Sequence, residues 1–135
     1  AIQPHIRKNP RHFGSVFISS TAGLMGESGG SVYCASKFGL LGFVESFAAE
    51  IAPLGGRANS VCPGNVDSPM LTTLAQKIGT REGRGADSVL ADLAASSAYN
   101  RLISPEEVAA ACSWLVSSHS SGISGQTIVV DGPHP

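Results

Sequence analysis

The stretch GESGGSVYCASK, from Gly26 to Lys37, places a serine among glycines directly before a tyrosine and a lysine that are four residues apart. A glycine-rich loop can present Ser28 as a nucleophile. The second half can instead begin a helix that carries Tyr33 and Lys37 on one face. These two interpretations require different folds, so the rest of the chain decides between them.

The composition is that of a globular chain without a charged patch that would bind a nucleic acid or a membrane. Of its 135 residues, 42% are hydrophobic and 14% are charged, and the net charge is −1. This length is enough for one domain with a core, so we assign residues 1–135 to no more than one domain. The nine Lys and Arg are scattered, and no apolar run approaches the roughly 20 residues that span a bilayer. We therefore expect neither a nucleic acid nor a membrane as partner.

The termini and the cysteines suggest a cytoplasmic protein. The N-terminal stretch AIQPHIRKNPRHFG has no apolar signal core. Cys34, Cys62 and Cys112 are far apart and lie in apolar surroundings. We expect reduced, buried thiols in the cytoplasm and no disulfide framework.

The first half of the chain reads as a strand, a loop and a long helix. The β-branched stretch at residues 14–20 predicts a strand buried on both faces, and the glycine-rich residues 21–30 predict a loop. A helix follows over residues 31–52, with Ser31 as candidate N-cap, and Pro53 and two glycines end it. Apolar and functional side chains share one face, which we expect to point inward: Tyr33, Lys37, Leu40, Leu41, Val44, Phe47, Ala48 and Ile51.

The second half repeats this alternation. The pattern predicts a strand, a variable and partly helical region, a helix and a last strand, over residues 57–64, 69–100, 104–117 and 125–132. Pro63 and Gly64 stop the first of these strands. Ser104, Pro105 and Glu107 form the signature of a capping box at the start of the helix.

Alternating strands and helices predict parallel pairing through right-handed crossovers. GESGG resembles the Gly-Asp-Ser-Gly-Gly loop of trypsin-like serine proteases, but those enzymes are antiparallel barrels whose serine loop precedes no long helix. A nucleophilic serine also requires a histidine and an acid. None of the four histidines stands in a context that indicates this role. We therefore interpret the segment around Ser28 as a flexible loop.

Polar and turn residues gather where parallel strands end, which is where open α/β sheets bind ligands. Ser19 and Ser20 end the first strand, Tyr33 and Lys37 begin the next helix, and a Pro-Gly pair ends the second strand. A free phenol has a pKa of about 10, and a nearby ammonium lowers the pKa of a phenol, which makes tyrosine a workable acid or base. Taken singly, a Tyr-Lys pair is commonly an ordinary helix pair, a serine a turn former and a Pro-Gly pair the end of a strand. Their combination at one sheet edge indicates a functional site.

These segments resemble the short-chain dehydrogenase/reductase family. ISSTAGLMG is similar to its serine segment, YCASK to its Tyr-x-x-x-Lys motif, NSVCPGNVDSPM to its Pro-Gly segment and SGISGQTIVVDG to its C-terminal strand. The similarity runs from Gly14 to Gly132, and Ser20 precedes Tyr33 by 13 residues, as in many members.

The resemblance implies reversible hydride transfer between a nicotinamide, NAD or NADP, and a small-molecule carbonyl or secondary alcohol. Tyr33 would donate or accept the proton, and Ser20, with Ser19 as the less favoured candidate, would orient the substrate oxygen. Lys37 would bind the nicotinamide ribose and lower the pKa of Tyr33. The residues implied in cofactor binding are Tyr33, Lys37, Pro63, Gly64, Val66 and Ser68, and no metal is implied.

The departures from the family are as informative as the matches. Members are roughly twice this length. They begin with a glycine-rich turn that holds the cofactor pyrophosphate. This chain has no G-x-G-x-x-G and no Asn-Asn-Ala-Gly segment, and a fourth catalytic residue, an asparagine, is expected before residue 1. The expected fold is therefore α/β, the C-terminal half of a Rossmann-like doubly wound parallel sheet, with three strands and crossover helices. Residues 1–135 would form the C-terminal catalytic portion of a single domain of this family.

Two alternatives to a partial reductase remain open. The first is a non-catalytic truncated subunit or oligomerisation module, since family members commonly assemble through the long helix and the last strand, and a full-length chain is expected to be a homo-oligomer. The second is the extended class of sugar epimerases, against which the short tail argues. Residues 72–100 would form a substrate lid, and NRLISPEEVA resembles reductases of 3-oxoacyl or 3-hydroxyacyl substrates.

Overall fold

A computed structural model describes residues 13–133 of the chain, and its centre is a three-stranded parallel sheet with the order β1-β2-β3. The strands are β1 (Gly14–Ile18), β2 (Arg57–Pro63) and β3 (Thr127–Val130). All pairs are parallel, with Val61 opposite both Ile18 of β1 and Ile128 of β3. The parallel α/β fold that the alternation predicts is confirmed, and it excludes the antiparallel barrel that a nucleophilic Ser28 would need.

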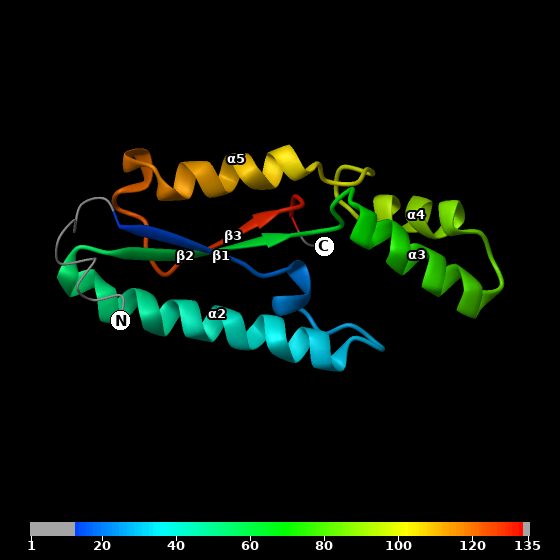
Figure 1. Ribbon diagram of the computed structural model, residues 1–135, viewed down its shortest axis with the longest axis horizontal. Helices are drawn as coiled ribbons and strands as arrows, with labels where there is room; N and C mark the ends of the chain where they lie inside the picture. Colours follow the sequence, from blue (N-terminus) through cyan, green and yellow to red (C-terminus); the bar gives the residue numbers. More distant parts are fainter. Residues whose placement is uncertain (1–12, 134–135) are drawn as a thin grey trace.

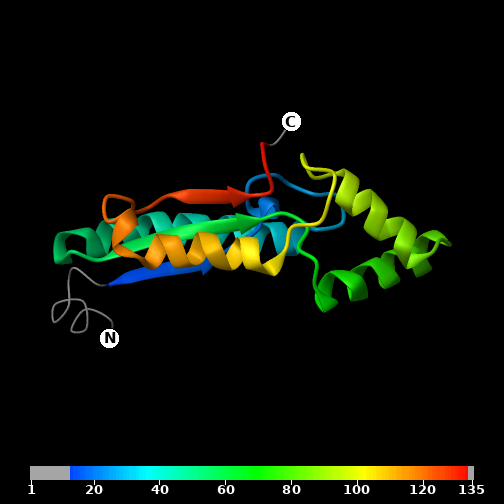
Figure 2. The same cartoon turned by 90° about the horizontal axis from the view of Figure 1, so that it is seen from above.

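Helices cover both faces of the sheet (Figure 1). The long helix α2 (Ser31–Ile51) lies on one face, and α5 (Pro105–Val116) lies on the other, in contact with all three strands. The helices α3 (Pro69–Glu82) and α4 (Ala86–Ala95) pack on each other beyond the carboxyl ends of the strands, as both views show (Figures 1 and 2). Three short 3-10 helices complete the described chain: η2 (Thr21–Gly23), η3 (Ala52–Leu54) and η4 (Ser118–Ser120).

Burial separates the central strand from its neighbours. Residues Ala58 to Pro63 of β2 are all buried, because β2 has a strand on each side and a helix on each face. The prediction that the first strand is buried on both faces is wrong: β1 is half-buried, and Ile18 is 46% exposed. Within residues 13–133, β1 pairs only with β2, so its other edge has no covering strand.

Helix α2 begins and ends for different reasons. Gly30 is its N-cap and no side chain caps it, so the prediction that Ser31 is the cap is wrong; Ser31 is the first helical residue. At the other end, Gly55 adopts a φ of 79°, a left-handed conformation that favours glycine, and the Gly56 N–H donates to the carbonyl of Ile51. The predicted stop at the Pro-Gly-Gly region is confirmed.

Only the C-terminal part of the predicted α2 face is buried. Val44, Ala48 and Ile51 form a core cluster with Ala58 of β2. The tyrosine at the start of the same face is 48% exposed, so the prediction that Tyr33 points inward is wrong. The first turns of α2 extend past the end of β1, and no strand of residues 13–133 covers them there (Figure 1).

Two polar side chains of β2, the half-buried Arg57 and the buried Asn59, hold the second crossover in place. The Arg57 guanidinium donates to backbone carbonyls at and after the end of α5, at 2.9–3.4 Å: those of Leu115, Ser117, Ser120 and Ile123. Asn59, which is fully buried, donates to the Ile123 carbonyl and accepts from the Gln126 N–H. These bonds satisfy carbonyls that a helix end leaves free.

The capping box predicted at the start of α5 is confirmed. The Ser104 hydroxyl accepts from the Glu107 N–H at 3.3 Å, and the Glu107 carboxylate accepts from the Ser104 N–H at 2.8 Å. Arg101 adds two hydrogen bonds to the same carboxylate. Hydrogen bonds from Arg101 and from the Ser104 N–H lower the pKa of Glu107 from 4.5 to about 2.

This depressed pKa predicts an acid-sensitive α5. The stabilising contribution of Glu107 should be complete above about pH 4.5 and should disappear as the pH falls toward 2 and the folded carboxylate protonates. Urea unfolding followed by circular dichroism at several pH values measures it. The stability difference between wild type and Glu107→Gln should shrink over this window, whereas Glu106→Gln in the same turn serves as control. A difference that does not change with pH would contradict the assignment.

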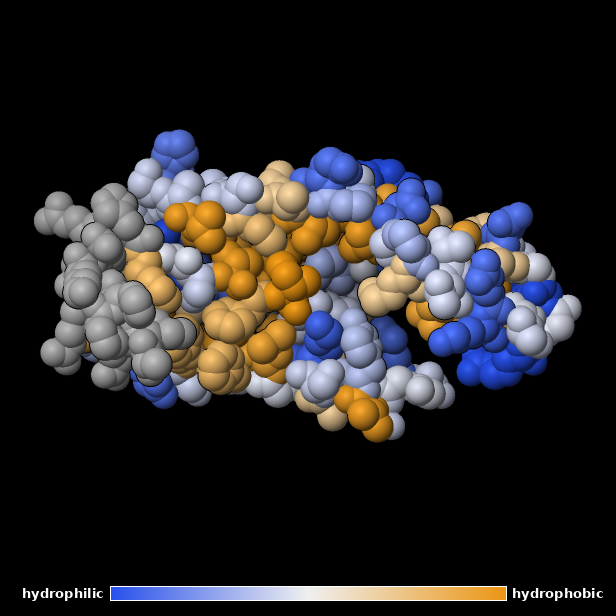
Figure 3. Space-filling model, in the orientation of Figure 1, coloured by the Kyte–Doolittle hydropathy of each residue, from blue (hydrophilic) through white to orange (hydrophobic). Residues whose placement is uncertain are grey.

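One face of the molecule is strongly apolar (Figure 3). Phe17 of β1 meets Phe43 and Phe47 of α2 edge-on, with ring centroids 5.5 and 6.1 Å apart, and Phe43 stacks on Phe47. Phe43 is nevertheless 52% exposed, and Ile18 beside the open edge of β1 is exposed as well. An unpaired strand edge next to exposed apolar side chains is a template for association.

We therefore predict that the 135-residue chain associates at low micromolar concentration and is only marginally stable. Phe43→Gln should shift sedimentation toward the monomer, because it removes exposed aromatic surface beside β1. Met70→Gln is the control, since Met70 is more exposed but lies on α3. A monodisperse wild-type monomer with sharp, reversible unfolding above about 60 °C would contradict this prediction.

Two further findings concern the environment of the chain. Among the helices of residues 13–133, none combines the length and the apolar character needed to cross a membrane. Cys34 and Cys62 are buried free thiols, as predicted, whereas Cys112 is only half-buried.

Candidate functional site

The predicted site residues come from three segments that meet at the carboxyl edge of the sheet (Figure 1). Ser19 and Ser20 follow β1, and Tyr33 and Lys37 lie in the first two turns of α2. The Pro63–Ser68 segment follows β2 and leads into α3. Parallel strands place their ends at one edge, which explains why segments far apart in sequence converge here.

Ser20 lies at the turn between β1 and η2. It is the N-cap of η2, and its hydroxyl oxygen accepts from the Ala22 N–H at 3.2 Å. A hydroxyl that accepts one hydrogen bond still has its own proton to donate. Ser20 is half-buried, so this proton is available to an oxygen atom of a ligand at the sheet edge.

The structure brings Tyr33 and Lys37 together. The Lys37 ammonium lies 5.6 Å from the centroid of the Tyr33 ring, a cation–π distance. The same ammonium donates to the Ile18 carbonyl at 3.1 Å, which leaves two of its three donors for other partners. Among residues 13–133, the Tyr33 hydroxyl has no hydrogen-bond partner. The lysine is thus tied to the strand end, while the phenol stays open to solvent.

Ser19, the less favoured candidate for contact with a substrate oxygen, is placed differently. It is 3% exposed, and its hydroxyl donates to the backbone carbonyl of Lys37 at 3.1 Å. A buried hydroxyl that is directed into α2 is not positioned to meet a substrate. Of the two serines, only Ser20 lies where such a contact is possible.

Gly64 occupies a position that a side chain could not. A Cβ atom at Gly64 would lie 2.1 Å from the carboxyl carbon of Asp131, so the two segments approach each other closely. The Gly64 N–H donates to the Val130 carbonyl, which joins the turn after β2 to the end of β3. The glycine predicted from the Pro-Gly signal therefore permits this close contact.

Val66 presents free main-chain groups. It forms an isolated parallel bridge with Ile103, in which the hydrogen bonds are made by its neighbours: the Ile103 N–H donates to Asn65, and the Asp67 N–H donates to Ile103. In such a bridge, the N–H and carbonyl of Val66 point to the opposite side. Among residues 13–133, neither group has a partner.

Ser68 is the N-cap of α3. Its hydroxyl oxygen accepts from the Leu71 N–H at 3.3 Å, and Pro69 follows at the first helical position. Ser68 also lines an open hollow of about 710 Å³ together with Thr72, Thr73 and Pro105. This hydroxyl therefore has a structural role and still faces solvent.

Two residues at this edge were missed by sequence reasoning. The Asn65 side chain donates to the Leu93 carbonyl and to the Ser96 hydroxyl, which ties the turn after β2 to the end of α4. Cys62 is fully buried, and burial raises the pKa of its thiol despite opposing effects of Ser19, Ser20 and the charge of Lys37. Asn65 carried no signal in the sequence beyond its neighbourhood to Pro63, and Cys62 was predicted only as a buried thiol and not as a neighbour of this site.

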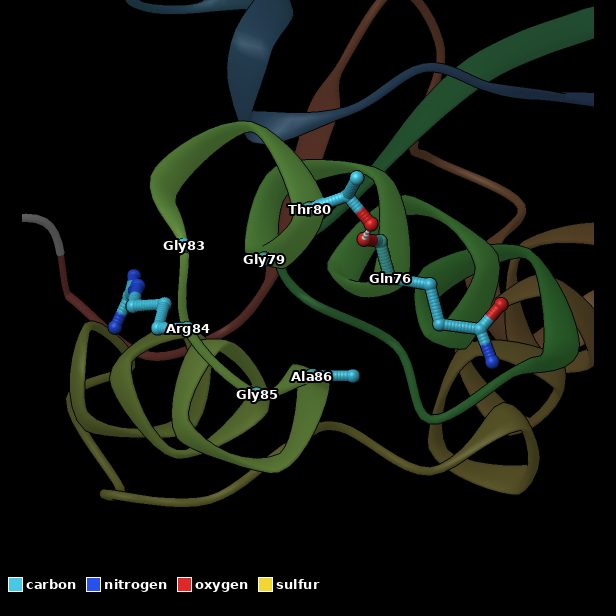
Figure 4. A pocket seen from close by; sticks show the side chains of 7 residues that line it. All are labelled: Gln76, Gly79, Thr80, Gly83, Arg84, Gly85 and Ala86. Carbon is cyan, nitrogen blue, oxygen red and sulfur yellow. Dashed lines mark hydrogen bonds between the residues drawn. The ribbon is translucent and has the colours of Figure 1, made fainter.

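A second hollow lies away from these residues. It has a volume of about 440 Å³ and is formed by the turn between α3 and α4 (Figure 4). Arg84 borders it, but its guanidinium already pairs with the carboxylates of Glu82 and Asp92. Among residues 13–133, no group of three His, Cys, Asp or Glu is arranged to hold a metal ion. The sheet edge thus remains the place where functional groups converge.

Comparison with known proteins decides the family. Residues 1–132 match the family model described as enoyl-(acyl carrier protein) reductase. The chain is 33% identical, over its whole length, to short-chain reductase protein NovJ from Streptomyces niveus. It belongs to the short-chain dehydrogenase/reductase family.

Two other relatives show how much of the family fold is present. Diacetyl reductase [(S)-acetoin forming] from Staphylococcus aureus is 32% identical over 93% of this chain, which corresponds to 49% of the relative. The structure of F189W actinorhodin polyketide ketoreductase with NADPH matches with a TM-score of 0.83 and 29% identity, over 90% of this chain and 47% of that one. The chain thus spans about half the length of the reductases that it matches, and its strands have the parallel arrangement of their Rossmann-like fold.

Proposed function

We propose that this chain is the catalytic portion of an NAD(P)-dependent oxidoreductase that interconverts a carbonyl compound and a secondary alcohol. The observation that carries the proposal is the arrangement of Tyr33, Lys37 and Ser20 at the carboxyl edge of a parallel sheet in a chain of this family. A complete enzyme would also need the glycine-rich turn that binds pyrophosphate, which this sequence lacks.

The residues that would hold the nicotinamide fit its chemistry. A carboxamide carries one acceptor oxygen and donor N–H groups, and the free N–H and carbonyl of Val66 complement them. Gly64 adds no side chain of its own to this turn, and the two spare donors of Lys37 suit ribose hydroxyls. When bound, the nicotinamide supplies or accepts the hydride at the substrate carbon.

The side chains of the protein would transfer the proton. In the reducing direction, the Ser20 hydroxyl holds the carbonyl oxygen, and the Tyr33 phenol gives that oxygen a proton as the carbon gains the hydride. In the oxidising direction, Tyr33 takes the proton back. Lys37 holds its positive charge beside the phenol ring and would favour the phenolate when the proton leaves.

The substrate class proposed for this portion is a 3-oxoacyl or 3-hydroxyacyl compound. NRLISPEEVA supports it, and so does the similarity to a polyketide ketoreductase. Diacetyl reductase is similarly related, so a small ketone is the appropriate competing substrate in an assay. The alternative, a non-catalytic module, is favoured if the tyrosine proves dispensable.

The first test restores an upstream half, taken from the natural upstream reading frame or from the actinorhodin ketoreductase. This longer chain should reduce a 3-oxoacyl thioester with NADPH or NADH. Tyr33→Phe removes the transferable proton and should lower turnover by about 100-fold or more. Lys37→Met should weaken cofactor binding and move the pH optimum upward.

Tyr99→Phe is the control for this test, because Tyr99 is exposed near the end of α4 and is not among the site residues. Normal turnover of the Tyr33→Phe variant would reject the catalytic role. An unchanged pH profile of Lys37→Met would remove the electrostatic role of the lysine.

A second prediction concerns the 135-residue chain by itself. It should bind no dinucleotide tightly, because the pyrophosphate normally rests on backbone N–H groups of a glycine-rich turn at a helix N-terminus. Titration calorimetry with NADH and NADPH measures this directly. Micromolar binding would show that these residues contain a phosphate site of another kind.

A further inference from the structure

A buried hydroxyl that the proposed reaction does not use lies directly behind the site. Ser19 donates to the backbone carbonyl of Lys37, 18 residues later in the sequence, at 3.1 Å. In an α-helix, that carbonyl already has a partner four residues further on, so the helix does not need the serine to satisfy it. The bond therefore fixes where α2 lies relative to β1.

A second hydrogen bond runs in the opposite direction between the same two segments. The Lys37 ammonium donates to the carbonyl of Ile18, the residue before Ser19, also at 3.1 Å. Both the backbone and the side-chain end of Lys37 are thus held by consecutive residues of one strand end. This double attachment restrains the position of the helix turn and the direction of the lysine side chain together.

Gly23 shows that the contact is close. A Cβ atom at Gly23 would lie 2.8 Å from the Ser19 hydroxyl and 3.0 Å from the Lys37 carbonyl. Real Cβ atoms do not approach other atoms at the first of these distances, so η2, β1 and α2 are packed around the hydroxyl without space for a side chain. The Ser19 hydroxyl thus lies where the three segments pack closely.

The other side of the hydroxyl is also occupied. Cys62 lies opposite Ser19 at the end of β2, is fully buried and interacts with the serine side chain. The Ser19 N–H also donates to the Val61 carbonyl of β2, at 2.8 Å. Ser19 thereby links β2, β1 and α2 at one point.

We propose that Ser19 is a positioning residue of the reaction: it holds the turn of α2 that carries Tyr33 and Lys37 in register with the strand end that carries Ser20. The proposal rests on the proposed function. It assigns the two adjacent serines different tasks, with Ser20 facing the substrate and Ser19 facing the helix. A small displacement of a catalytic group costs turnover steeply, by up to about 100-fold for 1 Å, so one buried hydroxyl can matter.

The test uses the longer chain with its upstream half restored and compares Ser19→Ala with Ser46→Ala. Ser46 is a matched control, because its hydroxyl also donates to a carbonyl of α2, that of Gly42, at 3.0 Å on an exposed face. Turnover, its pH profile and the thermal unfolding midpoint are measured for both. Ser19→Ala should lower turnover by about tenfold and move the pH profile in the same direction as Lys37→Met, and Ser46→Ala should change neither.

The pH profile separates positioning from stability. A purely structural serine would lower the unfolding midpoint and leave the pH profile of the folded enzyme unchanged. Either a wild-type pH profile in Ser19→Ala or a turnover within about twofold of Ser46→Ala overturns the proposal. If Ser19→Ala does not fold, Ser19→Cys, which keeps a side-chain atom at this place but only a weak donor, is held to the same criteria.

Tyr33→Phe, measured in parallel, separates the two proposals. If it keeps normal turnover, the proposed function fails and the role of Ser19 falls with it. If Tyr33→Phe is inactive while Ser19→Ala keeps the wild-type pH profile, only the positioning role is rejected.

Discussion

Two hydrogen bonds of 3.1 Å, one from Ser19 to the Lys37 backbone and one from Lys37 to Ile18, join the end of β1 to the second turn of α2. The arrangement of the site depends on this junction. It brings a hydroxyl, a phenol and an ammonium to one sheet edge although α2 extends past the strand and leaves Tyr33 uncovered. A helix held only by its apolar C-terminal part could rotate at its start, and these bonds restrain that rotation.

The turn after β2 contributes main-chain groups to the site. The proposed contact of this turn with the nicotinamide amide requires free main-chain donors and acceptors, although a folded chain pairs nearly all of its buried backbone groups. The bridge to Ile103 meets both conditions. Asn65 and Asp67 make its hydrogen bonds, so the N–H and the carbonyl of Val66 stay unpaired within residues 13–133. The hydrogen bond from the Gly64 N–H to the Val130 carbonyl then holds the turn against the end of β3.

The sequence predicted what depends on local pattern and on family motifs. The parallel order, the capping box at Ser104, the stop after Ile51 and the residues that meet at the sheet edge all follow from such signals. The half-burial of β1 and the exposure of Tyr33 could not be read in the same way, because burial depends on which elements lie alongside, and an apolar strand reads identically at an edge and in the interior. The different hydrogen bonds of Ser19 and Ser20 were likewise hidden, since two adjacent serines at a strand end differ only in the direction of their side chains.

The guanidinium of Arg57 has a consequence for the order of folding events. It joins the first residue of β2 to carbonyls 58 to 66 positions later, so the bonds can form only after α5 has closed back onto the sheet. Closing so long a loop costs conformational entropy before any of these contacts contributes. We therefore expect the segment from Arg57 to Val130 to complete its contacts late and as one unit. Its amide protons in β2 and β3 would exchange with solvent together, on a timescale separate from that of β1 at the open edge.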